Sequence, residues 1–420
     1  MSFQQGLSGL NATAKSLEVI GNNIANASTY GAKASRAEFG DVYAAALNGA
    51  GTNTIGIGVN LTAVSQQFTQ GNILTTENPM DLAINGAGFF QVTDGNSPIV
   101  YSRNGQFKID RDGYIVNNER KRLLGYPASG TGIIQPGAAT SLQLPTQGID
   151  PQVTTQIDIE FNLDSRLGIT APTSGPAIDY ADPTTYNNAT SMTVYDDRGT
   201  DVAVTYFFQK SGADTWNVFM TANGTTVGGT TAAPLPVTTI TFPPNGSAPT
   251  APVGAVAVNI PASTNAAGAA TLAIPGVQLD LTNSTHYGTG FGVTNMTQDG
   301  YAPGQLSSIS IESNGIVMAR YSNGQSRPAG QIEIATFRNP QGLQPMGGNV
   351  WGRTFSSGDP VLGTPGNGNL GVLQAGALEE SNVDLTAELV NMITAQRIYQ
   401  ANAQTIKTVD QIMQTLVNMR

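Results

Sequence analysis

The fold is decided first by residues 2–26, whose sequence is SFQQGLSGLNATAKSLEVIGNNIAN. Apolar or small residues recur in it at alternating steps of four and three, namely at Phe3, Leu7, Leu10, Ala14, Leu17, Gly21 and Ile24. Such spacing is typical of the heptad seam by which one helix packs against another. We therefore predict an N-terminal helix whose apolar seam requires a partner.

The C-terminal segment from about residue 384 to 419 repeats the helical pattern, with a neighbouring stripe of Val409, Ile412, Leu416 and Met419. We expect apolar residues of both ends to mediate subunit assembly. They are Phe3, Leu7, Leu10, Leu17, Ile24, Leu385, Leu389, Met392, Tyr399, Ile406, Met413 and Val417. The sequence predicts that the two terminal helices pair in a coiled-coil-like layer.

The polar faces of these helices carry few charges. Between residues 2 and 26 only Lys15 and Glu18 are charged, and uncharged polar side chains lose their water at lower cost than charges do. Gly6, Gly9 and Gly21 weaken the first helix in isolation. Two interpretations of these helices are open. One is a helical hairpin within a single chain, and the more specific one is a helical layer that other subunits complete.

Composition excludes several classes of function. Among 420 residues 11% are charged, and the net charge of −10 argues against nucleic acid or an anionic membrane as a partner. The chain has no cysteine, which excludes disulfides, thiolate chemistry and Cys-ligated metal sites. It shows no signal peptide and no apolar run of about 18 residues, so we expect no membrane insertion and export without a cleavable signal.

Between the ends, alternating apolar residues separated by turn signals predict β-strands, for example around Asn85-Gly86 and Asn314-Gly315. The segment 26–60 is predicted to be an irregular connector with a short helix near Phe39–Leu47. The expected fold is mainly β with terminal helices and nested β-barrel or sandwich domains. The predicted domains are 1–70 with 365–420 (helices and connector), 71–145 with 286–364 (inner β domain), and 146–285 (inserted outer β domain).

Candidates for catalysis or cofactor binding are weak. His286 is the single histidine, and we expect it in a surface loop or at a strand end. Residues 366–371 match a dinucleotide-binding pattern, but no βαβ unit surrounds them. Asp110 and Asp112 match the first two ligand positions of an EF-hand calcium loop. Ile115 and Lys121 stand where that loop requires a glycine at position six and a glutamate at position twelve, so the match fails. We predict no catalytic, cofactor-binding or metal-binding residues, and therefore no enzyme and no cofactor.

Several longer motifs occur in order along the chain. They are residues 22–26 with 29–33, 79–90, 101–107, 335–343, 376–385 and 392–403. The residues singled out from them are Asn22, Asn23, Asn26, Asp81, Gly86, Gly88, Phe89, Phe90, Asn339, Pro340, Gln396, Arg397, Tyr399, Gln400 and Asn402. In these motifs the chain resembles the bacterial flagellar rod, hook and hook-associated proteins, over roughly residues 1–145 and 286–420.

The resemblance implies a structural role. About 140 residues separate the two halves of the inner β domain, which is similar to the hook subunit, a component of a curved hollow tube that joins rod to filament. The implied partners are further copies of the chain, the distal rod protein, the hook cap protein, the first hook–filament junction protein and the flagellar type III export apparatus. The implied location is the extracellular hook. Ala32 departs from the family, which commonly has an aromatic residue there.

Two alternatives stay open at this point. One is a distal rod subunit with an unusual insert. The other, from a different class, is a secreted carbohydrate-binding or enzymatic β protein on a helical stalk.

Overall fold

The computed structural model describes residues 2–42, 56, 58–95, 97–172 and 177–418. They form two compact units. Unit 1 comprises Met1–Thr146, Ser307–Arg320 and Ser326–Arg420, and unit 2 comprises Gln147–Leu306 and Tyr321–Gln325. The predicted fold class, mainly β with paired terminal helices, is confirmed. The finer division into three domains stays a prediction.

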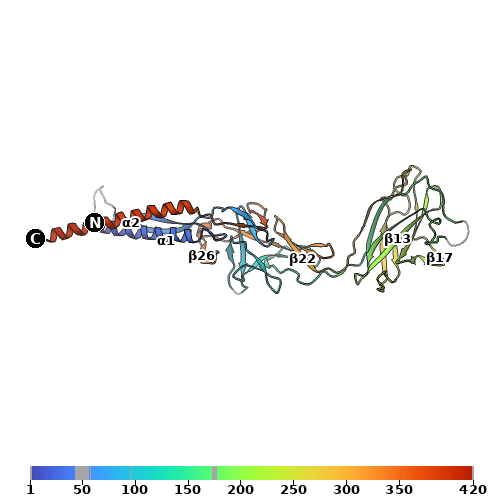
Figure 1. The fold of residues 1–420 in the computed structure, drawn as a ribbon, viewed down its shortest axis with the longest axis horizontal. Coiled ribbons are helices and arrows are strands. Elements are labelled where there is room, and N and C mark those ends of the chain that lie inside the picture. The colour runs from blue at the N-terminus through green and yellow to red at the C-terminus, as the bar shows by residue number, and fades with distance from the viewer. Residues whose placement is uncertain (1, 43–55, 57, 96, 173–176, 419–420) are drawn as a thin grey trace. The chain divides into compact units, whose positions relative to one another are not determined.

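Both predicted helices form and lie side by side in unit 1 as α1 (Ser2–Ala25) and α2 (Leu385–Asn418) (Figure 1). Asp384 caps the start of α2, because its Oδ1 accepts hydrogen bonds from the backbone N–H of Thr386 at 2.9 Å and of Ala387 at 3.1 Å. Among the helices of the described residues, none combines the length and apolarity needed to cross a membrane.

The connector after α1 is more regular than expected. Strands β1 (Ser35–Val42) and β2 (Gly58–Gln66) form an antiparallel hairpin with a bulge between Glu38 and Phe39. The predicted helix near Phe39–Leu47 is therefore wrong over residues 39–42, and residues 43–47 lie outside the described residues. Pairing with β2 supplies backbone partners that local propensity does not reveal.

The β part of unit 1 is built on a sheet of 13 strands. Its main path runs through β22 (Leu306–Ile311), β23 (Ile316–Tyr321), β24 (Ser326–Ile332), β9 (Arg122–Pro127), β5 (Phe89–Thr93), β6 (Val100–Ser102), β27 (Val350–Gly352) and β26 (Gln344–Gly347). Its side strands are β7 (Lys108–Ile109), β8 (Ile115–Val116), β10 (Thr140–Ser141), β25 (Ile334–Thr336) and β28 (Val361–Gly363). Thus strands from both halves of the sequence share one sheet, around a core that includes Leu82, Phe90 and Ile334.

Two short ladders connect this sheet to the helices. In the first, β4 (Leu82–Asn85) pairs with β29 (Val372–Ala375), and in the second β3 (Ile73–Thr75) pairs with β30 (Ala377–Glu379). Both are antiparallel and join segments about 300 residues apart in the sequence. They bring the chain leaving α1 next to the chain entering α2.

Unit 2 is a β sandwich. A sheet of four strands has the order β19 (Val256–Ile260), β20 (Ile274–Asp280), β11 (Gln156–Asn162), β21 (Gly292–Gln298). A sheet of five strands contains β12 (Asn188–Tyr195), β13 (Asp201–Lys210), β14 (Thr215–Ala222), β15 (Thr225–Val227) and β18 (Thr238–Thr241). Both sheets contribute to one core, in which Phe161 and Phe208 have ring centroids 4.5 Å apart. A separate hairpin pairs β16 (Gly229–Thr230) with β17 (Ala233–Pro234).

His286 lies in unit 2, and its predicted surface position is wrong. Its side chain is only 2% exposed, stacks on the Phe242 ring at 5.1 Å and meets the Trp216 ring edge-on at 5.9 Å. Burial lowers the pKa of His286 below its ordinary 6.5, the Lys210 cation lowers it further, and the Asp214 carboxylate opposes the shift. The histidine is a neutral part of the core.

Acid should therefore destabilise unit 2 through this one side chain. As the pH falls below 6.5, the unfolded chain binds a proton at His286 that the folded chain does not bind, so the free energy of unfolding decreases. In calorimetry between pH 7.5 and 5, we expect His286→Gln to show a smaller acid-induced fall of the unit 2 melting temperature. Equal pH dependence in variant and parent would contradict this.

Candidate assembly interface at the terminal helices

The buried face of α1 is made mostly of small and polar residues. Gly6, Thr13 and Asn23 are buried along it, together with one large apolar residue, Ile20. A Cβ atom at Gly6 would lie 3.0 Å from Cγ1 of Ile406, and one at Gly9 would lie 2.9 Å from Nδ2 of Asn402. The absence of side chains at these two positions lets the helices pack closely, which compensates for the low helix propensity of glycine.

The predicted apolar seam of α1 lies next to this face. Gly6, Thr13, Ile20 and Asn23 each immediately precede a seam position. Of the five seam residues assigned to assembly, Phe3 and Leu7 remain 49% and 44% exposed, and Leu10, Leu17 and Ile24 are half-buried. The intramolecular pairing therefore leaves much of the apolar seam open.

Helix α2 likewise uses only part of its apolar surface. Met392 and Ile406 are half-buried near α1, with Ala395 buried beside them. Leu385, Leu389, Tyr399, Met413 and Val417 are exposed. With 34 residues against 24, α2 continues past the start of α1 (Figure 1). Surface of this kind marks an interaction site.

An asparagine network holds the helix pair to the connector. The Nδ2 group of Asn23 donates to the backbone oxygen of Ser35 at 2.8 Å and to Oε1 of Glu388 at 3.1 Å, and its Oδ1 accepts from the Ser35 N–H at 2.8 Å. Asn382 accepts from the Ala34 N–H at 2.7 Å and donates to the Gln67 oxygen at 2.7 Å. These bonds fix where the chain leaves α1 and enters α2.

Beside this network lies a buried ionic cluster. Oε1 of Glu379 lies 2.5 Å from Nζ of Lys33, and its Oε2 lies 3.0 Å from Nη1 of Arg103. Lys33 also donates to the Thr69 oxygen at 2.8 Å, and Arg103 donates to the Gly86 oxygen at 2.8 Å. The three charged side chains are between 0% and 6% exposed. Segments from both halves of the chain are therefore joined at one carboxylate.

Burial lowers the pKa values of Lys33 and Arg103, while the Glu379 carboxylate opposes both shifts. Two cations face one anion here, so the cluster is stable only while its hydrogen bonds are complete.

Gly31 lets the backbone segments beside this cluster approach each other closely. Its N–H donates to the backbone oxygen of Glu379 at 2.8 Å, and a Cβ atom at this position would lie 2.5 Å from the backbone nitrogen of Asn104. Its φ of +71° also favours glycine.

The motif residues fall into four places. Asn22, Asn23 and Asn26 lie at the end of α1, where Asn26 Nδ2 donates to the Asn22 oxygen at 2.9 Å. Asp81, Gly86, Gly88, Phe89 and Phe90 lie near or in the core of the inner sheet, and Asn339 and Pro340 begin a short 3₁₀ turn (Pro340–Gly342). Gln396, Arg397, Tyr399 and Gln400 are exposed on α2, whereas Asn402 faces Gly9.

Sequence reasoning did not single out Lys33, Arg103, Glu379 or Asn382, although each stands inside a quoted motif. A weak signal existed, because charged residues are only 11% of the chain and eight of them fall in the quoted motif segments, with Lys33, Arg103 and Glu379 among them. Within the part of the chain that the structure describes, no group of three His, Cys, Asp or Glu residues is placed to hold a metal ion.

Four family models match in order along the chain. They are flagella basal body rod protein (3–33), flagellar hook protein FlgE/F/G D1 domain (83–162), flagellar basal body protein FlaE D2 domain (162–301) and flagellar basal body rod FlgEFG protein C-terminal (374–419). Flagellar hook protein FlgE of Escherichia coli K12 is 43% identical over 428 residues, which cover 100% of both chains.

The chain belongs to the flagellar hook protein family.

Other family members agree over the same length. Hook protein FlgE of Salmonella typhimurium LT2 is 42% identical and that of Borreliella burgdorferi 31% identical, each across 100% of this chain and at least 99% of its own. The crystal structure of Helicobacter pylori hook protein FlgE2 covers 73% of this chain and 100% of its own, with TM-score 0.52 and 15% identity, and so supports the fold. The chain is therefore a structural subunit of the flagellar hook that polymerises with itself.

Proposed function

We propose that this hook subunit assembles through its terminal helices into a curved, flexible, hollow tube that transmits torque from rod to filament. The observation that carries this proposal is the double use of the helices. A small and polar face pairs α1 with α2, while Phe3, Leu7, Leu389 and Val417 stay exposed beside it. Apolar stripes left open in one chain become buried when neighbouring chains complete the layer.

Purified chain tests the proposal directly. Raised in concentration, it should form helical tubes visible by electron microscopy, with the helices in an inner layer. A chain that stays monomeric under all polymerising conditions, or forms only closed small oligomers, would contradict a helical polymer.

The proposed partners at the ends of the tube are the distal rod protein, the hook cap protein and the first hook–filament junction protein. We propose export through the flagellar type III apparatus to the extracellular hook, without a cleavable signal. No enzymatic role is proposed, and the sparse, scattered titratable groups of the sequence favour a structural one. We also propose that the three domains form separate layers of the tube. These domains are the helices with the connector, the inner β domain and the inserted outer β domain.

Removing the inserted outer block should change the shape of the tube, but the tube should still assemble. The deletion is best made over residues 147–305, with a short Gly/Ser linker, because β11 and β21 pair within the removed block and β22 of the inner sheet begins at Leu306. The helices and inner sheet remain, so we expect tubes that are straight or irregular in electron micrographs and cells that swim poorly. Normally curved tubes would refute a shape-setting role, and loss of all polymer would show that the block is needed for assembly.

A further inference from the structure

Phe355 is a wholly exposed aromatic side chain on unit 1. It lies on the turn between β27 and β28, and its relative exposure of 104% is the highest among the large apolar side chains of the described residues. Aromatic side chains bury about 150–250 Å² of surface each and contribute much of the free energy gained when an interface forms. Its full exposure in the single chain therefore calls for an explanation.

The turn that carries Phe355 is rigidly braced. The Thr354 N–H donates to the Ser357 Oγ at 3.0 Å, and the Ser357 N–H donates back to the Thr354 Oγ1 at 3.2 Å. Asn339 Nδ2 donates to the Ser356 oxygen at 3.0 Å, and Arg353 pairs with Asp359 at 2.6 Å. A side chain held on such a turn loses little further backbone freedom when it binds.

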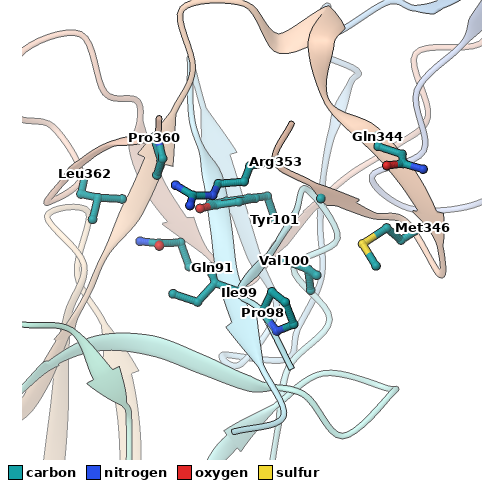
Figure 2. A pocket seen from close by; sticks show the side chains of 11 residues that line it. Gln91, Pro98, Ile99, Val100, Tyr101, Gln344, Met346, Arg353, Pro360 and Leu362 are labelled. Carbon is teal, nitrogen blue, oxygen red and sulfur yellow. The ribbon is translucent and has the colours of Figure 1, made fainter. Parts of the chain in front are cut away.

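A pocket of about 540 Å³ lies on the same unit (Figure 2). Val100 and Tyr101 lie on β6 and are buried, while Ile99, Met346 and Leu362 are exposed at 42%, 62% and 49%. In Figure 2, Met346 and Leu362 lie on opposite sides of Tyr101. The lining also includes the polar side chains of Gln91, Gln344 and Arg353, so the pocket is a partly apolar hollow large enough for a phenyl ring.

We propose that Phe355 of one copy fills the pocket between Met346, Tyr101 and Leu362 of a neighbouring copy. The ring does not enter the pocket of its own chain, since it is fully exposed although Arg353 and Pro360, on either side of it in sequence, line that pocket. When the ring of each copy enters the pocket of the next copy, the contact is heterologous, and heterologous contacts that do not close into a ring generate an open helical assembly. This deepens the proposed function and rests on it.

The small size of the contact suits a secondary contact between copies that are already held in the tube. One aromatic ring buries far less than the roughly 1,200–2,000 Å² of a stable interface. Such a contact cannot hold free monomers together, so the occupant must be a copy already positioned by the helical layer. It can also open and close at low cost while the tube rotates.

The absence of cysteine allows a direct test. Two single-cysteine chains, Phe355→Cys and Met346→Cys, are mixed, polymerised and mildly oxidised. We expect disulfide-linked dimers several times more abundant than from a mixture of Val253→Cys with Met346→Cys, because Val253 is equally exposed, at 96%, but lies on unit 2. Using two different chains excludes a bridge within one chain. If both mixtures polymerise and give equal yields of disulfide-linked dimer, the proposal is overturned.

A second variant keeps the test independent of cysteine chemistry. Phe355→Ser should leave the melting temperature of the monomer unchanged and raise the critical concentration for polymerisation about tenfold, whereas Val253→Ser should not raise it. Polymerisation of Phe355→Ser at the parent concentration would overturn the proposed contact. Failure of the parent chain itself to polymerise would instead contradict the proposed function.

Discussion

Leu7→Asp is expected to abolish polymerisation while the monomer melts at nearly its original temperature. In the single chain Leu7 is 44% exposed, so an aspartate there stays hydrated. In a completed helical layer the same carboxylate would be buried without a partner, at a cost of several kcal/mol per subunit. Since each 1.4 kcal/mol is about tenfold in affinity, the critical concentration should rise more than about 100-fold.

Sedimentation of polymer against total concentration measures this effect, with Asn11→Asp as the matched control. Asn11 is an exposed residue of the same helix outside the seam, so the control adds the same charge and should polymerise normally. If Leu7→Asp assembled like Asn11→Asp, the open seam would not lie in a contact between subunits.

Ile406→Asp should behave differently, because Ile406 packs against Gly6 within the same chain. It should reduce the helix content of the monomer by circular dichroism as well as polymerisation. Comparing the two variants separates the pairing of α1 with α2 from the contacts between subunits.

Glu379→Gln is expected to destabilise unit 1 by about 3–5 kcal/mol. The substitution preserves the size of the side chain but leaves Lys33 and Arg103 as two buried cations without their carboxylate. At about 2–4 °C per kcal/mol for a unit of this size, its melting temperature should fall by roughly 6–20 °C.

Calorimetry resolves this change if the transition of unit 1 moves while that of unit 2 does not. Glu119→Gln is the control, since Glu119 forms an ion pair with Lys121 at 2.5 Å near the surface, where such pairs contribute at most about 1 kcal/mol. Equal shifts for the two variants would show that the buried cluster contributes no more than a surface pair.

The helices and most strands could be predicted because their signals are local. A heptad repeat and an alternation of apolar residues are visible within ten to thirty residues. The hairpin of β1 and β2 was missed because Phe39–Val42 gain their strand form from pairing with residues that follow an intervening segment. His286 was misplaced because its burial depends on Phe242 and Trp216, which other strands supply.

The assembly interface was less predictable, for a different physical reason. Hydrophobic periodicity marks Phe3, Leu7 and Leu10, yet α1 meets α2 at Gly6 and Gly9, which pack closely because they have no side chain. The ionic cluster joins Lys33, Arg103 and Glu379 across as many as 346 positions. No spacing rule relates residues so far apart, and only the ladders of β4 with β29 and β3 with β30 bring them together.

The cluster around Glu379 also has a mechanical meaning. It ties the chain leaving α1, the chain entering α2 and the inner sheet at one point, and all three belong to one compact unit. A twisting load on the inner sheet then reaches the helices through several parallel backbone crossings and not through a single linker. We expect such a body to be torsionally stiff, so that the compliance of a bending hook resides in the sliding of whole subunits past one another.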